Sequence, residues 1–178
     1  MSTSTGGTLA LKLAAEFPEI AGLILISPNI EINDSKAWML NNPWGLQIAR
    51  LFKGRYNDIP DKTAIYAQYW NNHYRMEATV QLQELLETTM KHSVFKKIKQ
   101  PLLLLYYFKD EQHQDPVVKV SAMKRMFAQV STPDSLKKAV AIPNGGNHVL
   151  GSYIKSKDLP AVESAIDDFA RKVLKMKD

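Results

Sequence analysis

The chain has 178 residues and a mass of 20.1 kDa, which suits one domain with a substantial core. Apolar residues make up 45% of it and charged residues 23%, a globular composition that excludes a disordered tail, a collagen-like fibre and a simple coiled coil. The net charge is +5. The chain contains no cysteine, and this absence excludes disulfides, thiolate zinc sites and a cysteine nucleophile.

The first seven residues are small and polar apart from Met1. They contain neither the basic n-region nor the apolar h-region of a signal peptide, and no apolar run in the chain reaches the length of a transmembrane helix. We therefore expect a cytoplasmic protein without a membrane span. An alanine-rich run follows and stops before Pro18, which predicts a helix.

Two short apolar runs, Gly22–Pro28 and Pro101–Tyr107, are bounded by glycine or proline. Such runs are typical of strands that are buried on both faces, as in a parallel sheet. Residues 138–143 form a weaker third candidate strand. Helices are predicted near residues 119–130 and from about Pro160 to Lys175, so strands and helices alternate and indicate an α/β fold.

A long insertion, residues 31–97, separates the first two predicted strands and contains all three tryptophans. It is predicted to form several helices, because aromatic side chains recur at the helical spacing i, i+3, i+4, i+7. These side chains are Tyr66, Tyr69, Trp70 and His73. Stripes of this kind are more often packed in a core than used to bind a ligand.

A candidate nucleophile lies at the beginning of the chain. The residues from Ser2 to Gly6 fit the pattern Gly-x-Ser-x-Gly of a nucleophile elbow, with Ser2 in place of the first glycine. Ser4 is then the nucleophile, and the backbone N–H of Thr5 is a candidate oxyanion donor. The alternative interpretation of this cluster is a flexible end or a simple helix N-cap.

A serine nucleophile needs a histidine base and a carboxylate that orients the histidine. His148 lies in a glycine-rich loop just after a predicted strand, a context that the other histidines lack. Asp110 and Asp115 both follow the strand that ends at Tyr107. We favour Asp115, which implies an extended loop at residues 108–114, and keep Asp110 as the alternative acid. The alternate spacing of Glu111, His113 and Asp115 is too weak a pattern to predict a metal site. We also expect no cofactor.

These stretches together resemble the C-terminal portion of an α/β-hydrolase-fold serine hydrolase of the esterase or lipase kind, from the nucleophile elbow onward. The segment beginning Asp115-Pro116 resembles the Asp-x-Val-Val segment of that family. The resemblance implies a partial α/β-hydrolase fold with a short parallel sheet, flanking helices and a helical cap insertion. Residues 1–30 would carry the elbow, its helix and a strand, residues 31–97 the cap, and residues 98–178 the part of the core with the acid and the histidine.

The resemblance implies hydrolysis of a small-molecule carboxylic ester or related acyl substrate by Ser4, His148 and Asp115 (or Asp110), with Tyr69 and Trp70 in contact with the acyl group. The family's strands and second oxyanion donor before the elbow have no counterpart in the sequence. We therefore expect at most three parallel strands and an exposed sheet edge. Either the chain is part of a longer hydrolase, or a second copy or a partner chain covers that edge. By itself the chain is expected to be an incomplete or inactive hydrolase. The alternative is a non-catalytic, hydrolase-like interaction module. The basic residues of the second half are scattered without a nucleic-acid-binding motif, so no nucleic-acid partner is predicted.

Overall fold

The computed structural model describes residues 1–59, 61 and 63–176, and the chain divides into two compact units. The sheet unit comprises Met1–Asn33 and Thr89–Asp178, and the insertion unit comprises Asp34–Thr88. Among the described residues, no helix is both long enough and apolar enough to span a membrane. The sheet unit contains β1 (Ser2–Thr3), α1 (Thr5–Glu16), β2 (Leu23–Ile26), α5 (His92–Phe95), β5 (Leu102–Tyr106), α6 (Val120–Gln129), η2 (Asp134–Leu136), β6 (Lys137–Ala141) and α7 (Leu159–Lys172).

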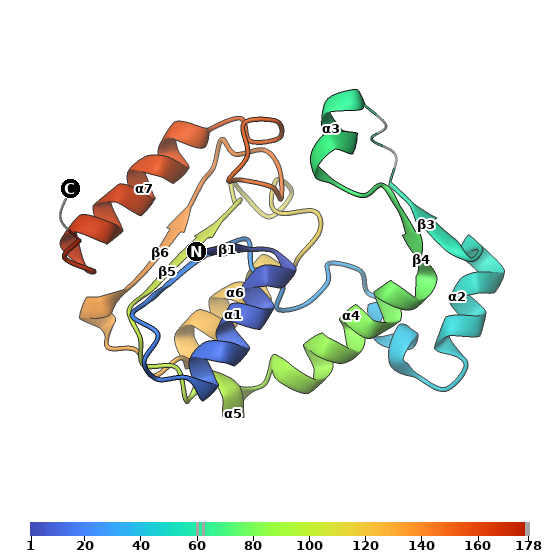
Figure 1. Ribbon diagram of the computed structural model, residues 1–178, viewed down its shortest axis with the longest axis horizontal. Coiled ribbons are helices and arrows are strands. Elements are labelled where there is room, and N and C mark those ends of the chain that lie inside the picture. The colour runs from blue at the N-terminus through green and yellow to red at the C-terminus, as the bar shows by residue number, and fades with distance from the viewer. Residues whose placement is uncertain (60, 62, 177–178) are drawn as a thin grey trace. The chain divides into compact units, whose positions relative to one another are not determined.

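The four strands of the sheet unit are parallel and lie in the order β1-β2-β5-β6 (Figure 1). Leu25 of β2 pairs with Ser2 on one side and with Leu104 on the other, and Leu104 in turn pairs with Ala139 of β6. Because all the strands run in one direction, their carboxyl ends lie at one edge of the sheet. The predicted α/β class with a short parallel sheet between helices is confirmed.

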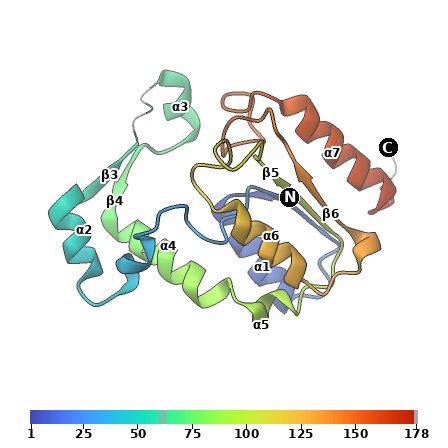
Figure 2. The ribbon, with the colours of Figure 1, turned by 180° about the vertical axis from the view of Figure 1, so that it is seen from behind.

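Helices cover both faces of this sheet, as the two opposite views show (Figures 1 and 2). All five residues of β5 are buried, and successive side chains enter different cores. Leu102 and Leu104 pack in the cluster that contains residues of α1 and α6, whereas Leu103 and Leu105 pack in the cluster that contains residues of α7. The uninterrupted apolar run of this strand therefore reflects burial on two faces.

The expectation of at most three parallel strands is wrong, because Ser2 and Thr3 form a fourth strand, β1. They pair with Leu25 and Ile26, so the last two residues of β2 have a neighbour on each side. Two polar residues are too few to produce an alternating pattern, and this strand exists because β2 offers it a parallel backbone partner. The edge of the sheet is therefore β1 rather than β2 at these positions.

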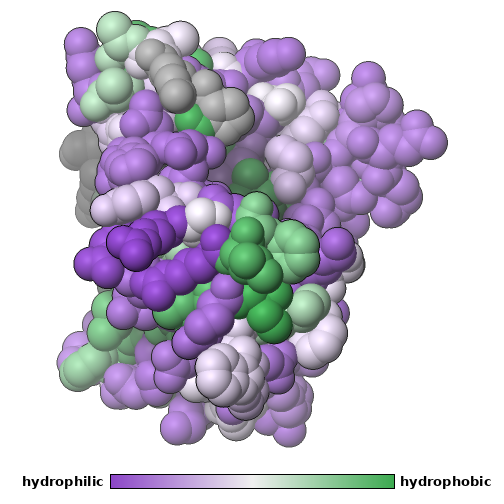
Figure 3. All heavy atoms as spheres, turned by 90° about the vertical axis from the view of Figure 1, so that its right-hand side faces the viewer, coloured by the Kyte–Doolittle hydropathy of each residue, from purple (hydrophilic) through white to green (hydrophobic). Residues whose placement is uncertain are grey.

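The insertion unit is mostly helical but also contains a small antiparallel sheet. Helix α3 ends at Tyr69, and His73 lies in a strand, so the prediction that His73 continues the helical stripe is wrong. The strand is favoured by the cross-strand pair His73–Asp58 and by the stacking of His73 on Tyr56. Figure 3 shows apolar side chains gathered beside hydrophilic ones on one face of the molecule. The elements of this unit are η1 (Ala37–Asn41), α2 (Gly45–Lys53), β3 (Tyr56–Asp58), α3 (Ala64–Tyr69), β4 (His73–Arg75) and α4 (Met76–Thr89).

Candidate active site

Ser4 occupies the sharp turn between β1 and α1. Its backbone has φ 49° and ψ −126°, a conformation that non-glycine residues rarely adopt and that is strained. Three hydrogen bonds hold this turn: the N–H of Ser4 donates to the carbonyl of Ile26 at 3.1 Å, and the carbonyl of Ser4 accepts from Gly7 at 2.9 Å and Asn29 at 3.0 Å. The strained backbone places the Ser4 side chain at the carboxyl edge of the sheet, as a nucleophile elbow requires.

The two glycines after Ser4 have different roles in this turn. A Cβ atom at Gly7 would lie 2.6 Å from Cβ and 2.9 Å from Cα of Pro28, a distance that side chains do not tolerate. A Cβ atom at Gly6 would meet only Cβ of Ser2, at an ordinary 3.7 Å. Close approach of the segment after β2 therefore requires glycine at position 7, whereas position 6, the second glycine of the predicted motif, has room for a methyl group.

Asp115 is placed by a loop that returns to the end of β5. The N–H of Asp115 donates to the carbonyl of Tyr107 at 3.1 Å, and Phe108 and Gln114 form a β-bridge that closes the loop between them. The carboxylate is buried, and its Oδ1 atom accepts the backbone N–H groups of Val117 at 2.9 Å and Val118 at 3.1 Å. These bonds fix the orientation of the carboxylate and compensate for its removal from water.

Asp110, the alternative acid, is exposed in the same loop, whereas Nδ1 of His148 is hydrogen-bonded to Asp115. Its carboxylate accepts hydrogen bonds from the ring of His113 at 2.8 Å and from the backbone N–H groups of His113 and Gln112. The hydrogen bond from the His113 ring, together with those backbone bonds, lowers the pKa of Asp110 below its usual value. The described residues contain no group of three potential metal ligands, so the Glu111, His113 and Asp115 spacing does not form such a cluster.

His148 connects Ser4 to Asp115. Its Nε2 atom lies 2.9 Å from Oγ of Ser4, and its Nδ1 atom lies 2.8 Å from Oδ2 of Asp115. The imidazole is buried, with 8% of the residue exposed. Ser4 lies 144 positions from His148 in the sequence and Asp115 lies 33 positions from it, yet the three side chains form one chain of hydrogen bonds.

The roles of the atoms in this chain follow from their chemistry. An ionised carboxylate can only accept hydrogen bonds, so Nδ1 of His148 must carry the proton that is shared with Asp115. In the neutral imidazole, Nε2 is then unprotonated and accepts the hydroxyl proton of Ser4. The arrangement can therefore transfer a proton from Ser4 to His148 when Ser4 attacks an electrophile.

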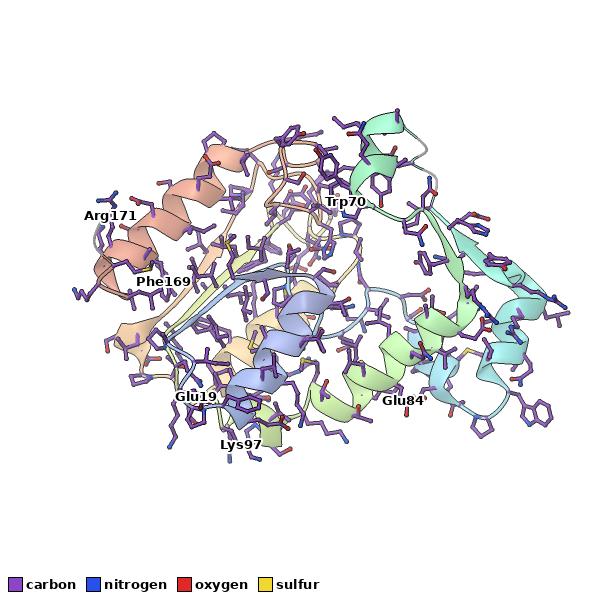
Figure 4. The ribbon with its side chains drawn as sticks, in the orientation of Figure 1. Glu19, Trp70, Glu84, Lys97, Phe169 and Arg171 are labelled. Atoms are coloured by element: carbon purple, nitrogen blue, oxygen red, sulfur yellow. The ribbon has the colours of Figure 1, made fainter. Side chains whose placement is uncertain are left out.

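The other predicted site residues are Thr5, Tyr69 and Trp70. Thr5 is the first residue of α1, so its N–H has no acceptor within the helix and is available to a ligand anion. Tyr69 and Trp70 lie in the insertion unit (Trp70 is labelled in Figure 4). The ring of Trp70 stacks on Tyr66 at 5.0 Å between centroids and meets Tyr69 edge-on at 6.0 Å. Their contact with substrate stays a prediction.

The sequence did not predict that the segment after β2 is hydrogen-bonded to the elbow and its helix. The buried side chain of Thr8 donates from Oγ1 to the carbonyl of Asn29 at 2.5 Å, and Asn29 in turn donates its N–H to Ser4. Ser27 begins this segment with φ 44°, a second strained residue next to the elbow. No sequence pattern predicts these contacts, because threonine is common in helices and asparagine is common after strands.

The sequence matches no protein-family model and no curated protein. Solved structures nevertheless resemble it over nearly its whole length. A structure of the metagenome-derived lipolytic enzymes LipS and LipT has a TM-score of 0.69 at 17% identity, covering 96% of this chain and 63% of that one. A monoacylglycerol lipase from Paleococcus ferrophilus has a TM-score of 0.65 at 17% identity, with 97% of this chain and 66% of that one covered. A carboxyl esterase from Bacillus coagulans has a TM-score of 0.64 at 17% identity, with coverage of 97% and 64%.

This chain has the α/β-hydrolase fold. It spans between 63% and 66% of the length of these three proteins, which agrees with the predicted C-terminal portion of that fold. The resemblance inferred from the elbow, the strands and the loops of the acid and the histidine is therefore confirmed for the fold. At this level of identity, it is the geometry of the site that must support any particular chemistry.

Proposed function

We propose that this chain carries the catalytic centre of a serine hydrolase that cleaves carboxylic esters, with Ser4 as nucleophile, His148 as base and Asp115 as the acid that orients His148. The observation that supports this proposal is the continuous hydrogen-bonded chain from Ser4 through His148 to Asp115. It begins on a strained residue at the carboxyl edge of a parallel sheet, and structurally similar proteins are lipases and esterases.

The reaction has two halves. Oγ of Ser4 attacks the carbonyl carbon of the ester while its proton moves to Nε2 of His148. The resulting tetrahedral intermediate collapses, His148 gives that proton to the departing alkoxide, and an alcohol leaves an acyl group on Ser4. Water then attacks the acyl group, His148 accepts a proton from the water, and return of that proton to Oγ releases the carboxylic acid.

Asp115 and Thr5 stabilise the charges that develop in these steps. The carboxylate of Asp115 holds Nδ1 of His148 and stabilises the imidazolium that forms when Nε2 takes a proton. The N–H of Thr5, at the positive end of the α1 dipole, donates to the oxygen that becomes negative in the tetrahedral intermediate. Neither role requires a cofactor.

The test is covalent labelling of the 178-residue chain with a fluorophosphonate, followed by peptide mass spectrometry. We expect an adduct on Ser4, no adduct in Ser4→Ala, and labelling that is slower by roughly 10²–10⁴-fold in His148→Ala, because the general base is lost. A chain that is folded by circular dichroism but leaves Ser4 unlabelled would instead support the alternative of a non-catalytic, hydrolase-like module.

The two aspartates provide a matched pair for assigning the acid. Asp115→Asn should slow labelling by roughly 10²–10⁴-fold, because the amide no longer holds His148 in the required tautomer. Asp110→Asn, in the same loop, should label at the wild-type rate because Asp110 contacts His113 instead. The opposite result would move the acid to Asp110.

We also propose that Tyr69 and Trp70 contact the acyl group of the substrate. Tyr69 is 61% exposed, so its replacement removes little packing within its own unit. Tyr69→Ala should raise KM for p-nitrophenyl esters of longer acyl chains more than for the acetate. Trp38→Ala, another exposed aromatic residue of the insertion unit, should leave both KM values unchanged.

A further inference from the structure

Helix α2 of the insertion unit turns its apolar side chains outward. Ile48, Leu51 and Phe52 recur at i, i+3 and i+4 and so share one face of the helix, on which Leu51 is 83% and Phe52 81% exposed. Arg50 is instead partly buried and binds Glu77 of α4 at 2.7 Å. A helix at a protein surface normally packs its apolar stripe inward, so the outward stripe calls for a contact with something outside the unit.

Two tryptophans extend this exposed surface. Trp44 immediately precedes α2 and is 72% exposed, and Trp38 lies in η1, which contacts α2. Indole rings combine an apolar body with one polar N–H, a combination suited to a boundary between water and an apolar phase. We call the following five side chains the α2 surface: Trp38, Trp44, Ile48, Leu51 and Phe52.

The segment that carries the α2 surface is basic, and the acidic side chains near it come from outside the segment: Asp34 and Asp58 flank it in the sequence, and Glu87 accepts a hydrogen bond from Asn41 of η1. Residues 35–57 contain four basic side chains and neither aspartate nor glutamate. Three of the four, Lys36, Lys53 and Arg55, belong to exposed residues. The α2 surface therefore presents exposed apolar side chains together with exposed basic ones from the same segment, which complements a partner that is apolar inside and negative at its boundary.

We propose that the α2 surface docks on an anionic lipid bilayer. The aliphatic and aromatic side chains enter the boundary between headgroups and acyl chains, and the basic residues contact anionic headgroups. A second copy of the chain would bring the same positive charges together, and a nucleic acid offers no apolar phase for Leu51 and Phe52. This inference is independent of the proposed hydrolysis, since it concerns no residue of the Ser4–His148–Asp115 chain.

The test is co-sedimentation of the 178-residue chain with vesicles of phosphatidylcholine, alone or mixed with phosphatidylserine. We expect binding to the mixed vesicles that weakens with added salt. Leu51→Ser/Phe52→Ser should lower the partition coefficient at least about ten-fold, because it removes apolar area that enters the bilayer. Lys53→Glu/Arg55→Glu should lower it at least about five-fold for each basic residue lost.

Lys96→Glu/Lys97→Glu is the matched control, because it changes the net charge by the same amount on the sheet unit and both residues are exposed (Lys97 is labelled in Figure 4). It should retain nearly all binding to the mixed vesicles. The proposal is overturned if the wild-type chain does not sediment with phosphatidylserine vesicles, or if this control loses as much binding as Lys53→Glu/Arg55→Glu. It is equally overturned if gel filtration shows a dimer that Leu51→Ser/Phe52→Ser dissociates while vesicle binding is absent.

Discussion

Replacing Thr8 by valine is expected to slow the proposed reaction of Ser4 without removing any atom of the Ser4–His148–Asp115 chain. Valine has nearly the same shape as threonine but lacks the hydroxyl group. The change therefore deletes the hydrogen bond from Oγ1 of Thr8 to the carbonyl of Asn29 while the surrounding packing is kept. Asn29 donates its N–H to the carbonyl of Ser4, and this bond remains in the variant, but Asn29 itself is held less firmly and so fixes the backbone of Ser4 less firmly.

The magnitude follows from the burial of the bond. Thr8 is fully buried and Asn29 is 4% exposed, so water does not readily replace the lost donor. Leaving a buried carbonyl unsatisfied costs about 1–3 kcal/mol of unfolding free energy. A small displacement of a nucleophile can reduce its rate by as much as about 10²-fold, and we expect a loss of about ten-fold in fluorophosphonate labelling because the Gly7 bond to Ser4 remains.

The matched control is Thr132→Val. Thr132 is also buried, at 3% exposure, and its Oγ1 atom donates to the carbonyl of Gln100 at 2.8 Å, away from the elbow. Urea denaturation should show a similar loss of stability for both variants, whereas only Thr8→Val should label more slowly at equal folded fraction. Equal labelling rates for the two variants would refute the idea that Thr8 positions Ser4.

Three further changes test the fold around the site. Gly7→Ala should lower the free energy of unfolding by about 1–3 kcal/mol, because the added Cβ atom has no room beside Pro28. Gly6→Ala should lower it far less. Equal losses for the two variants in urea denaturation would contradict the close approach of the segment after β2. Phe169→Ala should cost about 3–5 kcal/mol in the same assay, because this fully buried ring, which points from α7 toward the sheet in Figure 4, leaves a cavity. The pKa of Asp168 is lowered to about 2, chiefly by the hydrogen bond from Lys138, so the stability it contributes is complete above its ordinary value of 3.8 and is lost as the pH falls toward about 2. The difference in Tm between the wild type and Asp168→Asn should therefore shrink over that acid range, and a difference that stayed constant would contradict the assignment.

Some strands of the sheet could be predicted from the sequence and others could not. The continuous apolar runs predicted β2 and β5 because a strand buried on both faces needs apolar residues at every position. The strand formed by Ser2 and Thr3 left no such trace, because its only requirement is a backbone partner in β2. The helical spacing in the insertion likewise failed at His73, where pairing with Asp58 across two strands prevailed over the local pattern.

Some residues of the candidate site could likewise be predicted from the sequence, whereas others could be assigned only from the folded structure. The residue types and their order along the chain were enough to single out Ser4 and His148, because a nucleophile and a base need recognisable local settings: a tight turn with small neighbours and a glycine-rich loop after a strand. The choice between Asp110 and Asp115 was a preference from the sequence, and only the folded chain separates the two. The loop at residues 108–114 turns Asp110 outward to His113 and returns Asp115 to the end of β5, within 2.8 Å of His148.

The amino-acid sequence by itself thus determined the α/β class and singled out a candidate nucleophile, a candidate base and two candidate acids, because each of these depends on residues that are near one another in the chain. The tertiary structure alone decided which acid meets His148, which glycine the elbow requires, that Thr8 and Asn29 support Ser4, and that α2 exposes its apolar face. All four depend on where distant segments of backbone meet, and such distances are properties of the packed chain that no local pattern of residues encodes.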